Sequence, residues 1–287
     1  MALILYGKEV AAALIERSRD ESDRLCQIGC PPKLTIVRAG DDAADAAYER
    51  GIYRACERAG VIVSTHCTPF GASQRELTET LRSLSADRAV HGILLMRPLP
   101  RGFDERISRD AIAPEKDVDG VTDRSLSGVF TGSGEGFAPC TAMACVQLLE
   151  HYGIKIAGKN VVVIGRSLVV GRPVSMLLLA RDATVTVCHT KTANIAEICS
   201  SADIIIAAAG REGLIGRNCM SSGQTIVDCG INVNCGGKLC GDVDFEAASE
   251  IALAASPVPG GVGTVTAAVL ASHVVEAAQR LCGVAVL

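Results

Sequence analysis

The first third of the chain alternates between two patterns of hydrophobic positions. One repeats apolar side chains at the three- and four-residue spacing of a helix with one buried face, and the other is a short, nearly continuous apolar run. The helical segments fall at 7–28, 43–59 and 73–85, and the strand-like segments at 33–40, 61–68 and 91–100. Near-continuous apolar strands between helices are typical of a parallel sheet covered on both faces.

A second alternating series follows a stretch without clear periodicity. Residues 101–138 are richer in Gly, Asp, Ser and Pro, which predicts a linker with functional loops. The later helices are expected at 141–152, 171–180, 193–199 and 264–281, and the strands at 160–165, 183–189, 203–210 and 225–231. Strands separated by helices in this way indicate a doubly wound open sheet.

Length and composition favour two packed units of the α/β class. A chain of 287 residues is longer than one typical domain, so a two-domain arrangement is the default expectation. Apolar residues make up 48% of the sequence but aromatic residues only 3%. Burial must therefore depend on Ala, Val, Ile and Leu, which suits helices packed closely against parallel strands.

Charge and hydropathy exclude several classes of partner. The net charge is -4 with the two signs well mixed, and no run of five like charges suggests an arm that binds nucleic acid. The N-terminus has neither a basic segment nor a small-residue cleavage site before its apolar residues, and no apolar run is long enough to span a bilayer. We expect a cytoplasmic protein without a nucleic-acid or membrane partner.

The thirteen cysteines are scattered, odd in number and without a C-x-x-C pair. We interpret most of them as small buried apolar residues. Cys235 and Cys240 lie closest together and flank a Gly-Gly turn signal, which a hairpin explains better than zinc, because a tetrahedral site requires four ligands. No metal site is predicted.

The stretch KNVVVIGRSLVVGRP passes from an apolar strand through Gly165 and Gly171 into a helix with Pro173 in its first turn. The free amide groups of such a helix start attract phosphate. The spacing is G-x5-G rather than the dinucleotide fingerprint G-x-G-x-x-G, so the motif is weak by itself. The alternative is that the two glycines only shape a tight turn.

The tip of the next strand bears on which nicotinamide cofactor binds. A carboxylate there pairs with a ribose hydroxyl, whereas a cation accepts the additional 2'-phosphate. Here the tip reads CHTKT, with Thr190 and Lys191 and no acid, so NADP is preferred to NAD, with Arg166 as a second phosphate partner. Lys191 could also be a solvated surface charge. His189, a lone histidine at a strand end, is interpreted as a hydrogen-bonding residue rather than a catalyst.

Four stretches in order resemble the methylenetetrahydrofolate dehydrogenase/cyclohydrolase family, known in bacteria as FolD. They are GILLMRPLP at 92–100, PEKDVDG at 114–120, GRSLVVGRP at 165–173 and SPVPGGVGTVT at 256–266. The resemblance implies an N-terminal α/β catalytic domain that binds folate, at 1–120, completed by a C-terminal helix at 265–287. It implies a Rossmann-type NADP-binding domain at 121–264, and a homodimer.

The resemblance implies oxidation of 5,10-methylenetetrahydrofolate with NADP, followed in most members by hydrolysis of the methenyl product. Tyr48 and Asp119 would be the catalytic residues, with Asp119 bonding the pterin ring; within a D-G pair it could also be an ordinary turn residue. The implied substrate contacts are Tyr48, Pro98, Leu99, Asp119, Pro259, Gly260 and Gly261. The predicted cofactor contacts are Gly165, Arg166, Ser167, Gly171, Thr190, Lys191 and Ile231.

Two departures from the family pattern bear on the second reaction. Ile52 stands where the family has Lys, four residues after Tyr48, and Met96 stands where it has Gln; RACERAG at 54–60 keeps the register. Hydride transfer mainly requires two bound molecules to be aligned, whereas hydrolysis requires a positioned acid or base. We therefore expect dehydrogenase activity with weak or absent cyclohydrolase activity.

Two other hypotheses remain. The protein could be fully bifunctional, with its proton carrier supplied by another residue or by ordered water. It could also be a non-catalytic paralogue that binds folate or nucleotide. Separate assays of the two reactions distinguish all three.

Overall fold

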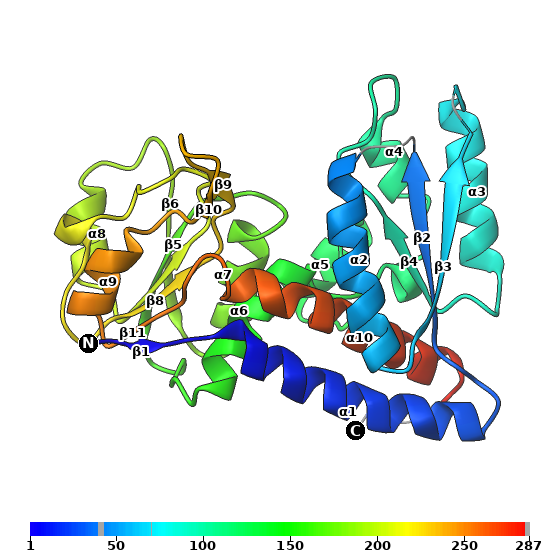
Figure 1. Cartoon of the computed structure of the whole chain (residues 1–287), viewed down its shortest axis with the longest axis horizontal. Coiled ribbons are helices and arrows are strands. Elements are labelled where there is room, and N and C mark those ends of the chain that lie inside the picture. The colour runs from blue at the N-terminus through cyan, green and yellow to red at the C-terminus, as the bar shows by residue number, and fades with distance from the viewer. Residues whose placement is uncertain (40–42, 70, 285–287) are drawn as a thin grey trace. The chain divides into compact units, whose positions relative to one another are not determined.

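A computed structural model of the chain describes residues 1–39, 43–69 and 71–284, without the side chains of 43–48. The chain divides into two compact units (Figure 1). The three-stranded unit comprises Ala12–Cys140 and Ala267–Leu287, and the six-stranded unit comprises Met1–Ala11 and Thr141–Thr266. Two long helices, α1 (Gly7–Gln27) and α10 (Val262–Leu281), contribute residues to both units. The domain boundaries expected from the sequence stay a prediction.

The three-stranded unit is built on a parallel sheet in the order β3-β2-β4. Its main elements are β2 (Lys33–Ala39), α2 (Ala43–Arg58), β3 (Ile62–Thr68), α3 (Gln74–Ala86) and β4 (Gly92–Leu95). Their order and type confirm the alternation expected from the hydrophobic pattern. The shorter β4 reflects the proline-containing end of the predicted strand, since proline cannot donate to a sheet ladder.

A buried apolar cluster holds this sheet against α3. Val37, Leu81 and Ile93 are each at most 1% exposed and belong to it. Ser73 and Glu76 form a reciprocal capping box at the start of α3, which satisfies amide groups that the helix cannot pair internally. On the other side, a Cβ on Gly92 would collide with Val118 and Val274, so α10 packs closely against β4. The C-terminal helix thus returns to the first domain, as expected.

The segment expected to be a linker with loops contains three short helices. They are α4 (Glu105–Arg109), the 3-10 helix η1 (Pro114–Lys116) and α5 (Asp123–Thr131). Asp104 and Thr122 cap α4 and α5 through their side chains, and Gly132 ends α5 in the left-handed conformation. Helices this short do not repeat a hydrophobic face often enough to be recognised from periodicity.

The six-stranded unit contains a parallel sheet in the order β1-β11-β8-β7-β5-β6. Its strands are β1 (Leu3–Ile4), β5 (Asn160–Ile164), β6 (Thr184–Cys188), β7 (Ile204–Ala207), β8 (Thr225–Asp228) and β11 (Ala254–Ala255). Its other helices are α6 (Cys140–His151), α7 (Gly171–Leu179), α8 (Ile195–Ser200), η2 (Arg217–Cys219) and α9 (Phe245–Ile251). The strand order reverses beside β5, as in a Rossmann-type fold.

The expected hairpin around Cys235 and Cys240 is confirmed. Strands β9 (Asn232–Val233) and β10 (Leu239–Cys240) pair antiparallel on either side of the Gly-Gly turn. The sequence pattern missed β1, β11 and α9. Each of the two strands has only two residues, too few to reveal an alternation.

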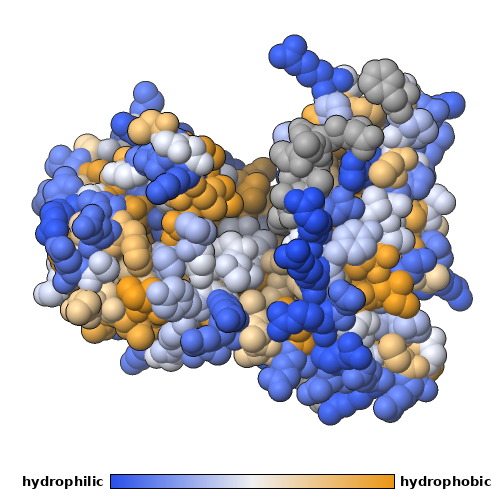
Figure 2. Space-filling model, in the orientation of Figure 1, coloured by the Kyte–Doolittle hydropathy of each residue, from blue (hydrophilic) through white to orange (hydrophobic). Residues whose placement is uncertain are grey.

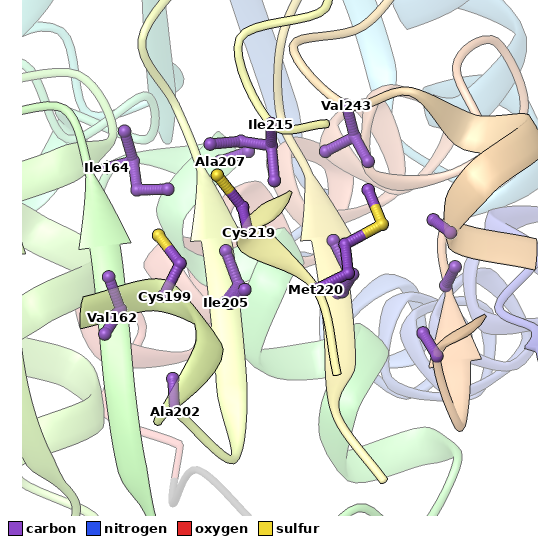
Figure 3. Packing of buried hydrophobic residues seen from close by; sticks show 14 of the residues in the cluster. Val162, Ile164, Cys199, Ala202, Ile205, Ala207, Ile215, Cys219, Met220 and Val243 are labelled. Carbon is purple, nitrogen blue, oxygen red and sulfur yellow. The ribbon is translucent and has the colours of Figure 1, made fainter. Parts of the chain in front are cut away.

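Buried aliphatic and sulfur-containing side chains fill one side of the six-stranded sheet. Ile164 from β5 and Ile205 from β7 point into the same cluster as Met220 and Val243 (Figure 3). Cys199 and Cys219 lie among them as free, buried thiols. The buried apolar role expected of most cysteines holds for six of the thirteen, because three others are exposed, two are partly exposed and two form a disulfide. This packing fixes the strand ends on which the candidate site is built.

Hydrophilic residues cover much of the face in view in Figure 2, with smaller hydrophobic areas between them. Within the described ranges, no helix is both long enough and apolar enough to cross a lipid bilayer.

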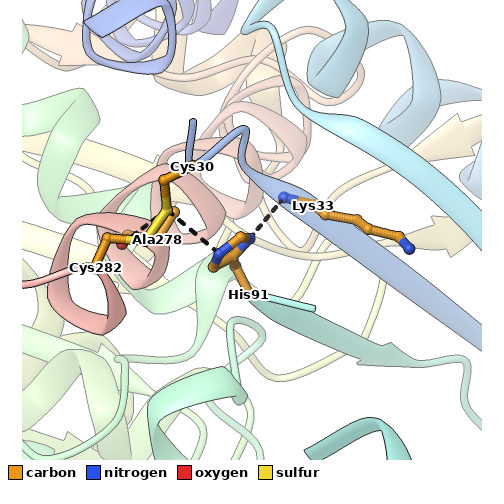
Figure 4. The surroundings of a disulfide bond; sticks show 5 residues. All are labelled: Cys30, Lys33, His91, Ala278 and Cys282. Carbon is orange, nitrogen blue, oxygen red and sulfur yellow. Dashed lines mark hydrogen bonds between the residues drawn. A yellow bond between two sulfur atoms is a disulfide. The ribbon is translucent and has the colours of Figure 1, made fainter. Parts of the chain in front are cut away.

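One pair of cysteines departs from the sequence interpretation. Cys30, after α1, and Cys282, after α10, form a disulfide within the three-stranded unit (Figure 4). They are 252 residues apart in the sequence, so spacing offered no sign of the bond. The bond attaches the end of α10 to the turn that precedes β2.

His91 beside this disulfide is oriented for hydrogen bonding rather than metal ligation. Its Nδ1 accepts a hydrogen bond from the Lys33 amide at 3.2 Å, and its Nε2 lies 3.6 Å from Cys30 Sγ. The ring nitrogen of a metal-bound histidine that faces away from the metal normally donates a hydrogen bond. Although Cys30, His91 and Cys282 lie close enough to share an ion, this accepting Nδ1 does not fit a metal ligand.

Candidate active site

The strand end that carries the glycine motif is closely packed. Gly165 follows β5 with φ +122, and a Cβ on it would overlap the Ala208 carbonyl group. A Cβ on Gly171 would in turn overlap the Gly165 carbonyl group. Both glycines are therefore required by backbone contacts, whatever binds beside them.

Helix α7 begins at this turn without a side-chain cap. The residue at its N-cap is Val170, whose side chain cannot accept a hydrogen bond. The Arg172 amide donates to the Ser167 carbonyl at 3.0 Å and Pro173 has no N–H, so at most the Gly171 amide is free among the first three positions of α7. Arg166 and Ser167 are exposed in the turn, where the Ser167 hydroxyl accepts a hydrogen bond from the Val170 amide at 3.2 Å. An uncapped helix start with a neighbouring cation is suited to an anionic group such as phosphate.

The tip of β6 carries the residues expected to select the cofactor. Thr190 and Lys191 are exposed just beyond Cys188, and β6 is an edge strand beside β5. The His189 Nδ1 accepts a hydrogen bond from the Lys191 amide at 3.1 Å. His189 therefore shapes the turn, as interpreted from the sequence, while the Lys191 side chain extends from it.

The remaining predicted contacts in this unit lie on two further turns. Ile231 follows β8 and is 70% exposed, which is unusual for a large aliphatic residue. Pro259 follows a cis peptide bond, and the Gly260 carbonyl accepts a hydrogen bond from the Gly7 amide at 2.8 Å. Gly261 has no room for a Cβ against the Pro257 carbonyl. The predicted substrate residues 259–261 thus belong to the six-stranded unit.

In the three-stranded unit, β4 leads to Met96 and then to a cis bond between Arg97 and Pro98. Pro98 is exposed, and Leu99 is partly buried against the core cluster. Arg97 donates to Asp119 at 3.3 Å and to Glu105 at 3.2 Å. The structure therefore brings the Pro-Leu-Pro turn and Asp119 together through Arg97, which the sequence interpretation did not include.

Asp119 differs from its neighbours in the motif PEKDVDG. Lys116 donates to the Asp87 carbonyl at 2.6 Å, and the Asp117 carboxylate accepts from the Thr122 amide at 2.8 Å, so both stabilise the backbone. The Asp119 carboxylate instead faces Arg97. Burial raises the pKa of Asp119 to about 6, while the Arg97 guanidinium acts in the opposite direction. Asp119 can thus change charge near neutral pH.

The positions of the two departures are apolar and buried. Ile52 is 0% exposed and Met96 is 4% exposed. Because Ile and Met have no ionisable group, neither position offers an acid or a base. The side chain of Tyr48 lies outside the described residues. Glu49, three residues before Ile52, accepts hydrogen bonds from Arg38 at 3.0 Å and from the Thr65 hydroxyl at 2.8 Å.

These features of the six-stranded unit define a class of protein. A parallel sheet of Rossmann type presents an uncapped helix start and a cation at the carboxyl ends of its first two strands, as in nicotinamide-nucleotide oxidoreductases. Residues 5–119 match the catalytic domain of tetrahydrofolate dehydrogenase/cyclohydrolase, and residues 139–282 match the NAD(P)-binding domain of the same family. The chain belongs to the tetrahydrofolate dehydrogenase/cyclohydrolase family.

Relatives and solved structures of the same family are similar to this chain over nearly its whole length. A bifunctional protein FolD from Clostridium kluyveri is 47% identical over 280 residues, covering 98% of this chain and 99% of the relative. A crystal structure of the bifunctional FolD from Campylobacter jejuni has a TM-score of 0.94 and 36% identity, covering 98% of this chain and 99% of that one. The Trypanosoma brucei FolD, solved with NADP and an inhibitor, has a TM-score of 0.89 and 32% identity, covering 97% and 98%.

Proposed function

We propose that the protein oxidises 5,10-methylenetetrahydrofolate to 5,10-methenyltetrahydrofolate with NADP. The observation that carries this proposal is the polar edge of the six-stranded sheet, where the uncapped start of α7 and Lys191 lie within the family's NAD(P)-binding domain. The T. brucei relative, solved with NADP, supports the same cofactor.

The residues present fit this cofactor. The Gly171 amide at the start of α7 would bind the pyrophosphate, and Thr190, Lys191 and Arg166 would hold the 2'-phosphate, since cations and a free amide group are suited to these anions. When bound, the nicotinamide ring accepts the hydride. Close packing at Gly165 and Gly171 keeps side chains away from the phosphate-binding backbone.

Asp119 is the group that we assign to substrate orientation. As a carboxylate it can accept hydrogen bonds from the N–H groups of a reduced pterin, and Arg97 keeps it in place. Orientation is the main requirement of hydride transfer, because the lone pair of a folate nitrogen expels the hydride without a protein proton carrier. Ile52 and Met96 are therefore compatible with this reaction.

An absorbance assay of the purified protein tests the proposal. With methylenetetrahydrofolate we expect NADPH and the methenyl product to form in equal amounts, and more slowly with NAD in place of NADP. Binding of both compounds without turnover would instead identify the non-catalytic paralogue. Homodimer formation and a cytoplasmic location stay predictions.

Hydrolysis of the methenyl product is the second candidate function. The names of the relatives from C. kluyveri and C. jejuni favour the fully bifunctional alternative over the expectation of weak or absent cyclohydrolase activity. In that case the proton carrier must be a group other than the side chains at positions 52 and 96, because Ile and Met cannot transfer protons. A separate assay of methenyl hydrolysis decides between the two.

A further inference from the structure

Two buried carboxylates lie near the carboxyl ends of the strands of the six-stranded sheet, which we call the cofactor edge. The proposed reaction does not use either of them. Asp228 is the last residue of β8 and is 3% exposed. Asp242 lies between β10 and α9 and is 0% exposed. A buried carboxylate is costly unless hydrogen-bond donors surround it, so its partners indicate what it holds.

Asp242 accepts hydrogen bonds from the backbone that follows β7. Its carboxylate accepts hydrogen bonds from the amides of Ala209 at 2.6 Å, Gly210 at 2.9 Å and Arg211 at 2.8 Å. The same carboxylate accepts from the side-chain amide of Asn232 at 2.9 Å. Three donors from the turn after β7 and one from the first residue of β9 therefore converge on one side chain.

Asp228 in turn holds Asp242 in place. It accepts hydrogen bonds from the amides of Asp242 at 3.1 Å and Val243 at 3.0 Å. It also accepts from the Gly230 amide at 2.8 Å, one residue before the exposed Ile231. Burial raises the pKa of Asp228 to about 6, although these backbone donors favour its carboxylate form.

Two glycines allow the carboxylates to approach the backbone. A Cβ on Gly230 would collide with the Asp242 carboxylate, and a Cβ on Gly241 would collide with the Asp228 carboxylate. Neither glycine has a positive φ, so close approach rather than backbone conformation explains them. The pair G-I at 230–231 and the run G-D-V at 241–243 are thus parts of one arrangement.

The two carboxylates are connected to the turn after β5 that contains Gly165 and is predicted to bind phosphate. The turn after β7 begins at Ala208, whose carbonyl group occupies the space that a Cβ on Gly165 would need. Asp242 fixes the next three amides of that turn and, through Asn232, the turn that carries Ile231. One carboxylate therefore connects the backbone beneath the predicted phosphate site to the turn with another predicted cofactor contact.

We propose that Asp242, seated by Asp228, is a positioning residue for the nicotinamide cofactor. It sets the spacing between the turn at 208–211, which supports Gly165, and the turn at 229–232, which carries Ile231. The proposal rests on the proposed function and assigns to its cofactor site two residues outside the predicted contact set.

The substitution Asp242→Asn changes this spacing with the smallest change in shape. An amide has one acceptor oxygen, and its NH2 group would face backbone N–H donors that now have no partner. The turns must separate to relieve this contact. We expect the Kd of NADPH to rise by about tenfold to a hundredfold, which corresponds to the usual cost of one unsatisfied buried group.

A milder variant keeps the test valid if Asp242→Asn does not fold. Asn232→Ala removes only the link from Asp242 to the second turn and leaves the three backbone donors in place. We expect a Kd increase of about threefold to tenfold, which corresponds to the net strength of an average intramolecular hydrogen bond. Asp244→Asn is the matched control, since this exposed residue caps α9 through the Ala247 amide and its hydrogen bonds among the described residues reach neither turn.

NADPH binding is measured by fluorescence titration of each full-length variant, with thermal unfolding and folate binding measured in parallel. The proposal predicts weaker NADPH binding for Asp242→Asn and Asn232→Ala, with folate binding within twofold of the unaltered protein, and no change in NADPH binding for Asp244→Asn. A lower melting temperature with unchanged NADPH affinity in both variants would show a structural role only and overturn it.

The same titration separates this proposal from the proposed function. If the unaltered protein binds NADPH but does not oxidise methylenetetrahydrofolate, the proposed reaction is wrong. The positioning role is then still tested by the Kd values of NADPH for the variants. If the unaltered protein does not bind NADPH, the cofactor assignment and the positioning role are both wrong.

Discussion

The two units differ in the side chains buried at their candidate sites, which are hydrogen-bonded carboxylates in one unit and apolar side chains in the other. In the six-stranded unit, seven hydrogen bonds to the carboxylates of Asp228 and Asp242 hold the segments that follow β7, β8 and β10, and Lys191 is exposed at the tip of β6. In the three-stranded unit, Ile52 and Met96 are buried apolar side chains at the two positions where the resemblance described from the sequence implies Lys and Gln.

The difference shows that the two reactions of this family depend on different features. Hydride transfer needs a cofactor and a substrate held in register, and both units offer groups for that purpose. Hydrolysis additionally requires proton transfer, and the side chains of Ile52 and Met96 carry no group that can transfer a proton. Substitutions among the residues that hold the cofactor turns should therefore impair the dehydrogenase reaction, whereas substitutions at positions 52 and 96 test whether hydrolysis depends on these two side chains.

The largest effect is expected from introducing a polar pair at positions 52 and 96. Ile52→Lys with Met96→Gln should raise the rate of methenyl hydrolysis by about 10²- to 10⁴-fold if proton transfer limits it. Burial of a lysine should lower its pKa toward the range useful for acid-base catalysis. Hydrolysis and NADP reduction are measured separately, with Ile52→Met and Met96→Leu as apolar controls. An unchanged hydrolysis rate in a folded double variant would place the limiting step elsewhere.

We expect loss of the disulfide between Cys30 and Cys282 to lower the stability of the protein. Cys282→Ser should lower the free energy of unfolding by about 2 to 4 kcal/mol, because the link that attaches the end of α10 is lost. Chemical denaturation measures this change. Cys26→Ser, at an exposed free cysteine in α1, serves as the control and should have no effect. Equal stabilities of Cys282→Ser and the unaltered protein would mean that the bond does not stabilise the fold.

Lys191→Gln should narrow the preference for NADP. Loss of a charge-assisted hydrogen bond to the 2'-phosphate should reduce kcat/KM for NADP by about tenfold and leave the value for NAD unchanged. Lys238→Gln, an exposed lysine in the hairpin of the same unit, is the control. If both cofactors were affected equally, Lys191 would not be a 2'-phosphate ligand.

The smallest effect concerns pH. With its pKa at about 6, Asp119 is mostly ionised at pH 8 and about half ionised at pH 6, so the KM for folate should roughly double as the pH falls between these values. Arg97→Leu removes the cation that lowers this pKa, so the rise in KM should begin at a higher pH. A pH-independent KM in both proteins would exclude Asp119 as a hydrogen-bond acceptor for the substrate.

Sequence periodicity identified the long elements because their hydrophobic faces repeat. It predicted the strands of the first domain and most of those in the second, and the Gly-Gly hairpin followed from its turn residues. It missed β1 and β11, which depend on partners far away in the sequence. Such short strands are defined by pairing rather than by local pattern.

The candidate site was predictable only where chemistry is local. Gly165, Lys191 and Asp119 lie in short motifs that could be recognised directly. Arg97 acquires its role through contact with Asp119, which is 22 residues away, and Asp242 acts on turns about 10 and 33 residues earlier. An Asp beside a Gly gives no sign of such contacts, because the same pair also occurs in ordinary turns.

The most direct test of the account is the initial rate of NADP reduction by the purified protein with methylenetetrahydrofolate, compared with NAD under the same conditions. The account predicts formation of NADPH together with an equal amount of methenyl product, and a higher kcat/KM for NADP than for NAD. No reduction of either cofactor, or an equal kcat/KM for both, would contradict it.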